Sequence, residues 1–333
     1  MRLNDLPQPP TDKSGWPWTL EDESEMPLLP EYPRISIITP SYNQGGFVEE
    51  TIRSVLLQNY PEIEYIVIDG NSKDQTQLVL DKYKSHFAFC SSEADSGQSE
   101  AINKGMRRAT GALVAWLNSD DFYLPGTLMR VAKAYLETGA GLIAGPVINF
   151  RHGGEVERVI YQDGLNVEFL GSFHQPGIFF DRQLWLKIGG VDEQLDYCMD
   201  RDLLYRALAL SSVAHLSEPL AMFRLHEQSK CERSGIFGNK QFELRQRLVM
   251  LNEDYLTLDR YGKISAKQRQ NFARQLSHLT GLALQRMDLA FLPELWQFAL
   301  EKRLGSATAL SFFQRIWSKI KDRVTVSAHE DAD

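Results

Sequence analysis

The chain has 333 residues, of which 43% are hydrophobic and 24% charged, an ordinary composition for a soluble protein of about two domains. No stretch approaches the length of a transmembrane helix, which excludes a membrane-spanning class. The formal net charge of −8 hides an asymmetry: residues 1–232 carry −13, residues 233–323 carry +8, and the last ten residues carry three acids. The basic C-terminal third therefore indicates an anionic partner, a membrane surface rather than nucleic acid.

Three scattered cysteines, Cys90, Cys198 and Cys231, show no paired spacing, which favours reduced thiols and a cytoplasmic setting. The first ten residues lack the apolar run of a signal peptide, and we expect none. Residues 1–33 hold seven prolines and little periodicity, so they predict a tether or a strap lying on the surface.

Strands alternate with helical patterns over the first half of the chain. The expected strands cover 34–40, 64–69, 87–91, 113–117 and 141–147, and the expected helices cover 48–58, 73–84 and 99–110. This alternation predicts a parallel sheet with right-handed crossovers. Further along, we expect a hairpin partner at 155–161, a strand at 178–180, helices at 182–188 and 200–210, and helices almost throughout 239–323 with breaks near Gly262 and Pro293.

The strand at 113–117 leads at once into Asn118, Ser119, Asp120 and Asp121. Ligands of open α/β sheets bind beyond the carboxyl ends of the strands, and two adjacent carboxylates repel each other unless a cation lies between them. Because Mg²⁺ and Mn²⁺ take carboxylate and phosphate oxygens, one hypothesis is a metal-bridged phosphate site. The alternative is that both aspartates only cap the following helix.

Acids follow three successive strands, with Asp69 after the second, Asp95 after the third, and Asp120 and Asp121 after the fourth. Like charges gathered at one sheet edge destabilise a free protein, so the pattern indicates ligands for them. An aspartate can accept hydrogen bonds from ribose hydroxyls or a base N–H. The first strand is followed by neither Gly-x-Gly-x-x-Gly nor a P-loop, which favours phosphate binding by a metal over a glycine loop.

Four motifs together resemble the family-2 glycosyltransferases. They read Ile-Ile-Thr-Pro-Ser-Tyr-Asn-Gln from 37, Val-Ile-Asp-Gly-Asn-Ser-Lys-Asp-Gln-Thr from 67, Ser-Glu-Ala-Asp-Ser-Gly-Gln-Ser-Glu-Ala-Ile-Asn-Lys-Gly from 92, and Leu-Asn-Ser-Asp-Asp from 117. The resemblance implies an α/β GT-A fold, Rossmann-like, with a mostly parallel central sheet and helices on both faces. We place this domain at 34–232, followed by a basic α-helical extension at 233–325 and an acidic tail at 326–333.

The resemblance also implies roles for the matching positions. Nucleotide contacts are expected from Thr39, Pro40, Tyr42, Asn43, Asp69, Asp95, Gly97, Asn103, Lys104 and Asp120. A divalent metal, Mn²⁺ or Mg²⁺, is expected at Asp120, Asp121 and His226. The family often has an acid two places before the metal aspartate, where this chain has Asn118, so both Asp120 and Asp121 remain candidates. The alternative for His226 is an ordinary core or surface histidine.

Asp200 matches the acidic motif that supplies the general base, and its alternative is a helix N-cap. Asp202 is the second candidate for the base, unless it pairs with Arg201 or Arg206. The donor and acceptor pocket is expected to include Asn118, His174, Gln175, Arg201 and Asp202. Trp185 is expected in the core rather than against a sugar.

The predicted function is inverting transfer of a sugar, UDP-linked by family frequency, to a hydroxyl of a glycan or lipid-linked saccharide. Two alternatives are a sugar-1-phosphate nucleotidyltransferase and a non-catalytic sugar-nucleotide-binding protein. A nucleotidyltransferase would usually have a glycine-rich loop with a lysine after the first strand, and residues 41–46 hold no Lys or Arg. Residues 311–323 place aromatic and aliphatic side chains on one helical face and basic ones on the other, which predicts either an interfacial helix on the inner membrane face or a packed amphipathic helix.

Overall fold

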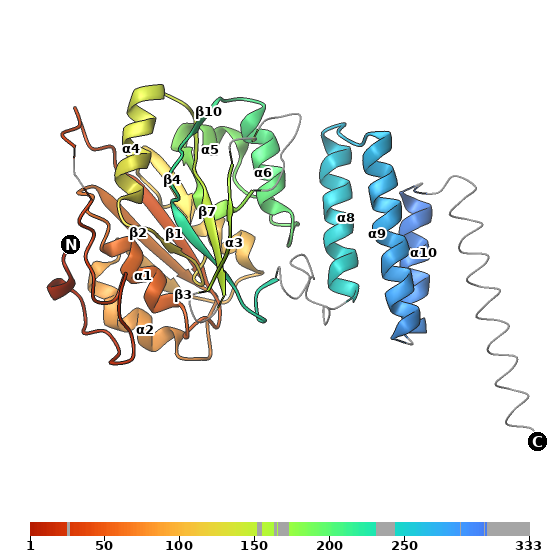
Figure 1. Cartoon of the computed structure of the whole chain (residues 1–333), viewed down its shortest axis with the longest axis horizontal. Coiled ribbons are helices and arrows are strands. Elements are labelled where there is room, and N and C mark those ends of the chain that lie inside the picture. Colours follow the sequence, from red (N-terminus) through yellow and green to blue (C-terminus); the bar gives the residue numbers. More distant parts are fainter. Residues whose placement is uncertain are drawn as a thin grey trace, which may run out of the picture. The chain divides into compact units, whose positions relative to one another are not determined.

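The computed structural model describes residues 1–24, 27–151, 155–162, 165, 173–230, 244–286, 288–302 and 304 (Figure 1). The chain divides into two compact units, Met1–Ser229 and Lys230–Asp333, which we describe separately. The expected interfacial helix at 311–323 and the acidic tail at 326–333 lie outside the described residues.

Seven strands form the central sheet of the first unit, in the order β10-β6-β9-β4-β1-β2-β3. They are β1 (Ile35–Ser41), β2 (Ile63–Asp69), β3 (Phe89–Ser92), β4 (Leu113–Trp116), β6 (Leu142–Ala144), β9 (Ile178–Asp181) and β10 (Val213–His215). All neighbours are parallel except β9, which is antiparallel to both β4 and β6. The mostly parallel α/β sheet predicted from the sequence is confirmed.

Helices cover both faces of this sheet (Figure 1). On one face lie α1 (Val48–Leu56), α2 (Thr76–Tyr83) and α4 (Thr127–Thr138), and on the other lie α3 (Gln98–Met106), α5 (Arg182–Ile188) and α6 (Met199–Leu208). Because side chains alternate along a strand, Ile37 joins the core under α1, whereas Ile38 meets α3 at Gly105. Trp185 is buried, 5.9 Å from the Trp116 ring between centroids, as expected for a core residue.

A second sheet, in the order β5-β11-β7-β8, lies beside the first. Its strands are β5 (Phe122–Tyr123), β7 (Val147–Arg151), β8 (Val156–Ile160) and β11 (Ala221–Leu225). The hairpin expected between β7 and β8 is present, but the single strand expected at 141–147 is wrong. Pro146 has no N–H to continue a ladder, so β6 ends at Ala144 and the chain passes into the other sheet as β7.

The proline-rich N-terminal segment is bound to α1 through a buried arginine. The guanidinium of Arg53, which is wholly buried, donates to the carbonyls of Pro7 at 2.8 Å, Pro17 at 3.0 Å and Trp18 at 3.1 Å. It also donates to the hydroxyl of Tyr83 at 3.0 Å. Apart from the short η1 (Leu3–Asp5), the segment has no regular helix or strand among its described residues, and these bonds hold it as a strap along the first unit (Figure 1).

The second unit contains α8 (Leu244–Arg260), α9 (Ala266–Gln285) and α10 (Leu292–Glu301). One face of α9 is buried, at Phe272, Leu276, Leu279 and Ala283. The break expected near Gly262 separates α8 from α9, whereas Pro293 lies in the first turn of α10, where its missing N–H costs nothing. Within the residues that the structure describes, no helix is long and apolar enough to cross a membrane.

Candidate active site

Strands β1, β2 and β3 end level with one another. Ser41 is paired with Asp69, and Asp69 with Ser92, so the segments that follow these strands meet at one edge. Strand β4 ends earlier, opposite Ile38, and the Leu117 amide still donates to the Ile38 carbonyl at 2.8 Å. The Asn118–Asp121 turn therefore emerges at the same edge, where ligands of open α/β sheets bind.

Gly70, the first residue after β2, lies close against Asp95 and Tyr42 at this edge. A Cβ atom on Gly70 would lie 3.1 and 3.2 Å from the two carboxylate oxygens of Asp95 and 3.3 Å from the ring of Tyr42. The Tyr42 side chain is exposed, with a residue exposure of 61%. Burial raises the pKa of Asp95, with a further contribution from the nearby charges of Glu100 and Asp69. Two residues predicted to contact a nucleotide thus lie together at Gly70, where the absence of a side chain lets both approach the backbone.

Three other predicted nucleotide contacts use their side chains within the protein. The Asp69 carboxylate is wholly buried and accepts from the Ser72 amide at 3.0 Å and from the hydroxyls of Ser72 and Ser92, each at 2.5 Å. The side chain of Asn43 accepts from the Lys73 amide at 2.8 Å. The Thr39 hydroxyl bonds the hydroxyl of Tyr65 at 3.0 Å inside the sheet. These side chains shape the edge, and Pro40 is likewise buried in β1.

The N-terminus of α3 orients Asp95. Gly97, at φ +135°, is the N-cap of this helix, and its amide donates to the Asp95 carboxylate at 3.0 Å. Further along α3, the Asn103 side chain is bound to the backbone of Val191 at 2.9 and 3.1 Å. Lys104 forms an ion pair with Glu100 at 2.8 Å.

The two aspartates after β4 have different surroundings. Asp120 faces His226, with 2.9 Å between the carboxylate Oδ2 and the ring Nε2, and the two side chains are 18% and 8% exposed. Asp121 is only 1% exposed; its Oδ1 accepts from the Arg224 amide at 2.9 Å, whereas its Oδ2 has no hydrogen-bond partner. Burial, followed by the charge of Asp120, raises the pKa of Asp121 well above its usual range. This burial argues against the metal role expected for Asp121.

Asp120 and His226 suit a small divalent ion. The carboxylate and the imidazole, which lie within hydrogen-bond distance at 2.9 Å, are both groups that can bind a divalent cation. No group of three or more His, Cys, Asp or Glu side chains with a metal-binding arrangement occurs among the described residues. Any ion held here would therefore take its other ligands from a bound diphosphate and from water. Asn118, the first residue of this turn, accepts a hydrogen bond from the Gln98 side chain at 2.7 Å.

Arg224 and Glu50 were not predicted from the sequence. Arg224 lies under the Asp120–Asp121 turn and donates through Nε to the Asp120 carbonyl at 2.9 Å. Its Nη2 forms an ion pair with Glu50 of α1 at 2.5 Å. Arg224 stands two residues before His226 in the same motif, and this nearness in sequence is the one signal that could have identified it.

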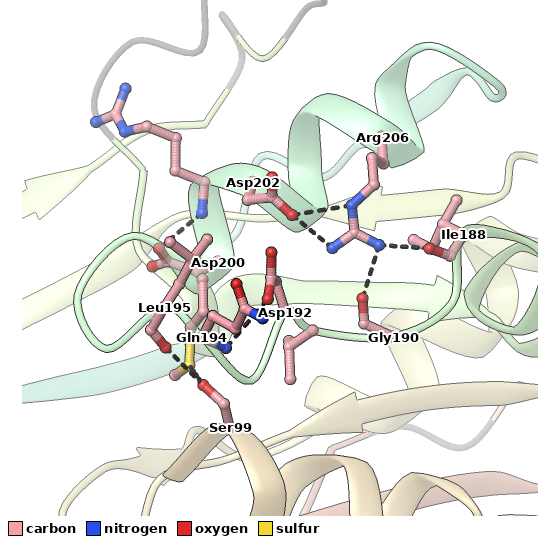
Figure 2. Close-up of polar contacts among 12 residues, drawn as sticks. Ser99, Ile188, Gly190, Asp192, Gln194, Leu195, Asp200, Asp202 and Arg206 are labelled. Atoms are coloured by element: carbon pink, nitrogen blue, oxygen red, sulfur yellow. Dashed lines mark hydrogen bonds and ion pairs between the residues drawn. The ribbon is translucent and has the colours of Figure 1, made fainter. Parts of the chain in front are cut away.

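The two acids of α6 also differ from each other (Figure 2). Asp202 is wholly buried and accepts from Arg206 at 2.9 and 2.7 Å, and Arg206 in turn donates to the carbonyls of Ile188 and Gly190. Asp200 is half-buried in the first turn, and its Oδ1 accepts from the Arg201 amide at 2.7 Å. The N-cap of α6 is Cys198, so Asp200 is not the cap. The ion pair argues against Asp202 as the base.

The remaining predicted pocket residues lie where β9 begins. The Gln175 side chain donates to the Trp116 carbonyl at the end of β4, at 2.6 Å. The His174 ring lies 4.4 Å from the Phe223 ring, between centroids. Burial, with a smaller contribution from the Arg158 charge, lowers the pKa of His174 to about 4. The Arg201 guanidinium lies over the Phe173 ring at 5.8 Å.

A mostly parallel sheet with one antiparallel strand and acids gathered at its edge defines the GT-A class of folds. The structure is similar to Staphylococcus aureus TarS residues 1–349 in complex with UDP-GlcNAc, with a TM-score of 0.53 and 18% identity over 81% of this chain and 88% of that one. It is also similar to the mannosyltransferase PcManGT from Pyrobaculum calidifontis in complex with GDP-Man and Mn²⁺, with a TM-score of 0.55 and 17% identity over 83% of each chain.

The sequence profile of glycosyl transferase family 2 matches residues 36–205, and the chain belongs to this family. It is 32% identical to the uncharacterized glycosyltransferase Rv1514c of Mycobacterium tuberculosis over 62% of this chain and 81% of that protein. Over 42% of its length, this chain is 34% identical to the "putative teichuronic acid biosynthesis glycosyltransferase TuaG" of Bacillus subtilis. The chain spans 60% of TuaG and 65% of a Rickettsia typhi relative.

Proposed function

We propose that the protein is an inverting glycosyltransferase that moves a sugar from a nucleotide-diphosphate donor, a UDP-sugar in preference, to a hydroxyl of a glycan or lipid-linked saccharide. One observation carries this proposal: Tyr42 and Asp95, which meet at Gly70, lie at the same sheet edge as the Asp120–His226 pair. A nucleoside bound by Tyr42 and Asp95 would direct its diphosphate towards Asp120.

Tyr42 and Asp95 offer the two kinds of contact that a nucleoside needs. The exposed Tyr42 ring can stack on a planar base. The Asp95 carboxylate, oriented by the Gly97 amide, can accept a hydrogen bond from a base N–H or a ribose hydroxyl. The complexes of TarS with UDP-GlcNAc and of PcManGT with GDP-Man support a sugar-nucleotide ligand in this fold.

Asp120 and His226 would hold the divalent cation. Bound there, Mn²⁺ or Mg²⁺ would supply a Lewis acid that stabilises the charge of the departing diphosphate. Gln98 would hold Asn118 beside this turn, and Arg224 would hold its main chain. The presence of Mn²⁺ in the PcManGT complex supports this assignment.

Asp200 would remove the proton of the acceptor hydroxyl. Inversion requires a base on the side of the sugar opposite the leaving diphosphate, so the base must be separate from the Asp120 turn. Asp200 is half-buried on α6, and the neighbouring acid Asp202 is already committed to Arg206. The hydrogen bond from the Arg201 amide, at 2.7 Å, orients the Asp200 carboxylate.

Incubation with a panel of sugar nucleotides tests the proposal against its alternatives. Release of nucleoside diphosphate supports transfer, pyrophosphate would indicate a nucleotidyltransferase, and no turnover with any donor and acceptor would indicate a non-catalytic binding protein. Calorimetry of UDP with Mn²⁺ and then with a chelator tests the metal. Equal UDP affinity in both conditions would contradict the metal assignment at Asp120 and His226.

A lipid-linked acceptor would bring the protein to the inner face of the membrane. The sequence of residues 311–323 supports a peripheral anchor, since each basic residue near an anionic leaflet contributes about 1 kcal/mol. The full chain should therefore co-sediment with anionic liposomes, less so at high salt, while a chain ending at Leu310 stays unbound and active on a free acceptor. Equal binding of both chains would reject this segment as the anchor.

A further inference from the structure

Arg224 is enclosed by aromatic rings. Its side chain is 6% exposed, and its guanidinium carbon lies 4.6 Å from the ring centre of Phe150 and 5.0 Å from that of Phe47. The ring of Phe122 lies 5.9 Å away. Ring faces attract a cation, and in this enclosure water competes little for the guanidinium, so its hydrogen bonds fix its position.

This one residue holds both aspartates of the turn. Its Nε donates to the Asp120 carbonyl and its amide donates to the Asp121 carboxylate, each at 2.9 Å. His226, two residues further along, meets the Asp120 carboxylate at 2.9 Å. The main chain of Asp120 is therefore held by Arg224 and its side chain by His226, and a shift of Arg224 would move the carboxylate that faces the ligand edge.

The charge of Arg224 is balanced by a residue that the N-terminal segment holds. Glu50 accepts from Arg224 Nη2 at 2.5 Å and from the indole N–H of Trp18 at 3.3 Å. Trp18 is 6% exposed, and its own carbonyl is bound to the buried Arg53. Trp18 and Arg224 both lie outside residues 36–205, the part matched by the family profile.

We propose that Trp18, Glu50 and Arg224 form a positioning relay, through which the N-terminal segment fixes the Asp120–Asp121 turn for a nucleotide diphosphate. The role at the diphosphate rests on the proposed function, whereas the relay itself is a property of the free protein. Loss of the Glu50 charge would leave the buried guanidinium without the carboxylate it pairs with. Arg224 would then turn towards the carboxylates of the turn and displace Asp120.

Hydrogen exchange of the free protein tests the relay without any ligand. In Glu50→Gln, the amides of Arg224 and Asp121 should exchange about tenfold faster, the equivalent of about 1.4 kcal/mol, and Trp18→Phe should accelerate them less. The matched control is Glu21→Gln, which removes the same charge from an exposed ion pair with Arg2 in the same segment. Unchanged exchange in Glu50→Gln, or equal acceleration across the first unit with a lower melting temperature, would overturn the relay.

Calorimetry of UDP in the presence of Mn²⁺ tests the consequence for the ligand. Glu50→Gln should weaken UDP binding about tenfold at a temperature where the variant is still folded, and Glu21→Gln should match the wild type. Wild-type UDP affinity in Glu50→Gln would overturn the positioning role. A wild-type protein that binds none of the sugar nucleotides would instead contradict the proposed function, and hydrogen exchange alone would then decide the relay.

Discussion

The turn after β4 and the start of α6 arrange two aspartates in the same way. In each, one acid is buried, Asp121 or Asp202, and the other, Asp120 or Asp200, stays half-buried. In each, an arginine holds the buried acid and also donates to main-chain carbonyls. In each motif the buried acid is held within the protein, and the less buried acid is the one to which we propose a chemical role.

The two arginines differ in what neutralises them. Arg206 pairs directly with Asp202, four residues away on the same helix. Arg224 gives Asp121 only its backbone amide, and its guanidinium pairs with Glu50 on α1. The α6 arrangement is therefore local to one helix, whereas the β4 turn depends on α1 and on the N-terminal segment bound to it.

The largest expected effect is on turnover, and it distinguishes Asp200 from Asp202 on α6. Asp200→Asn should lower turnover about 10²–10⁴-fold, because the amide cannot accept the acceptor proton, with donor affinity unchanged. Turnover rates and calorimetric donor affinities measure this, with the exposed Asp196→Asn as the control. Near-normal turnover in Asp200→Asn would remove the base assignment.

A stability measurement probes the other acid of α6. Asp202→Asn should lower the free energy of unfolding by about 3–5 kcal/mol, because it leaves the partly buried Arg206 without its carboxylate. Urea unfolding of this variant measures the loss of stability. The double variant Asp202→Leu with Arg206→Met, which removes both charges, should recover part of the free energy of unfolding. A loss below about 1 kcal/mol would mean that the ion pair is not the anchor of this helix.

Substitution of Arg53 tests whether the Asn118–Asp121 turn after β4 depends on the N-terminal segment. Arg53→Met should cost about 2–4 kcal/mol, since it leaves carbonyls of Pro7, Pro17 and Trp18 without their donor. Hydrogen exchange should then rise at the Asp121 amide but not at the Asp202 amide. The control, Arg34→Met, removes an exposed pair with Glu62 and should cost at most about 1 kcal/mol. Equal acceleration at both amides would break the comparison.

The smallest expected effect concerns His174, whose ring is buried and lies near the charge of Arg158. Because its pKa falls from 6.5 to about 4 on folding, the folded protein binds fewer protons than the unfolded one between these values. The free energy of unfolding should therefore fall by about 1–3 kcal/mol as the pH drops from 6.5 to 4. His174→Phe should remove this fall, and the exposed His215→Gln should not; identical pH profiles for wild type and His174→Phe would refute the assignment.

The sequence predicted the sheet, most of its helices and the acids at its edge, because periodicity and strand-end placement follow from local patterns. It did not predict how those acids divide. Asp69 and Asn43 match nucleotide-contacting positions, yet their side chains bind the 72–73 backbone. Asp69 reaches Ser72 within its own turn, whereas Asn43 meets Lys73 only because β1 and β2 pair in this register. Glu50 and Arg224 are 174 residues apart, a pairing that no local pattern reveals. The sequence contains the Gly145–Pro146 pair at which β6 ends, but no local pattern predicts the second sheet that begins with β7.

The reversed direction of β9 affects how this fold could change its acceptor over evolution. Because β9 runs against β4 and β6, its first residue, Ile178, pairs with the last residue of β6, and its last, Asp181, with the first of β4. The chain therefore arrives at the ligand edge just before β9 and leaves at the opposite edge. Insertions before Gln175 would remodel the pocket, whereas insertions after Asp181 would enlarge the far side of the molecule and leave specificity untouched.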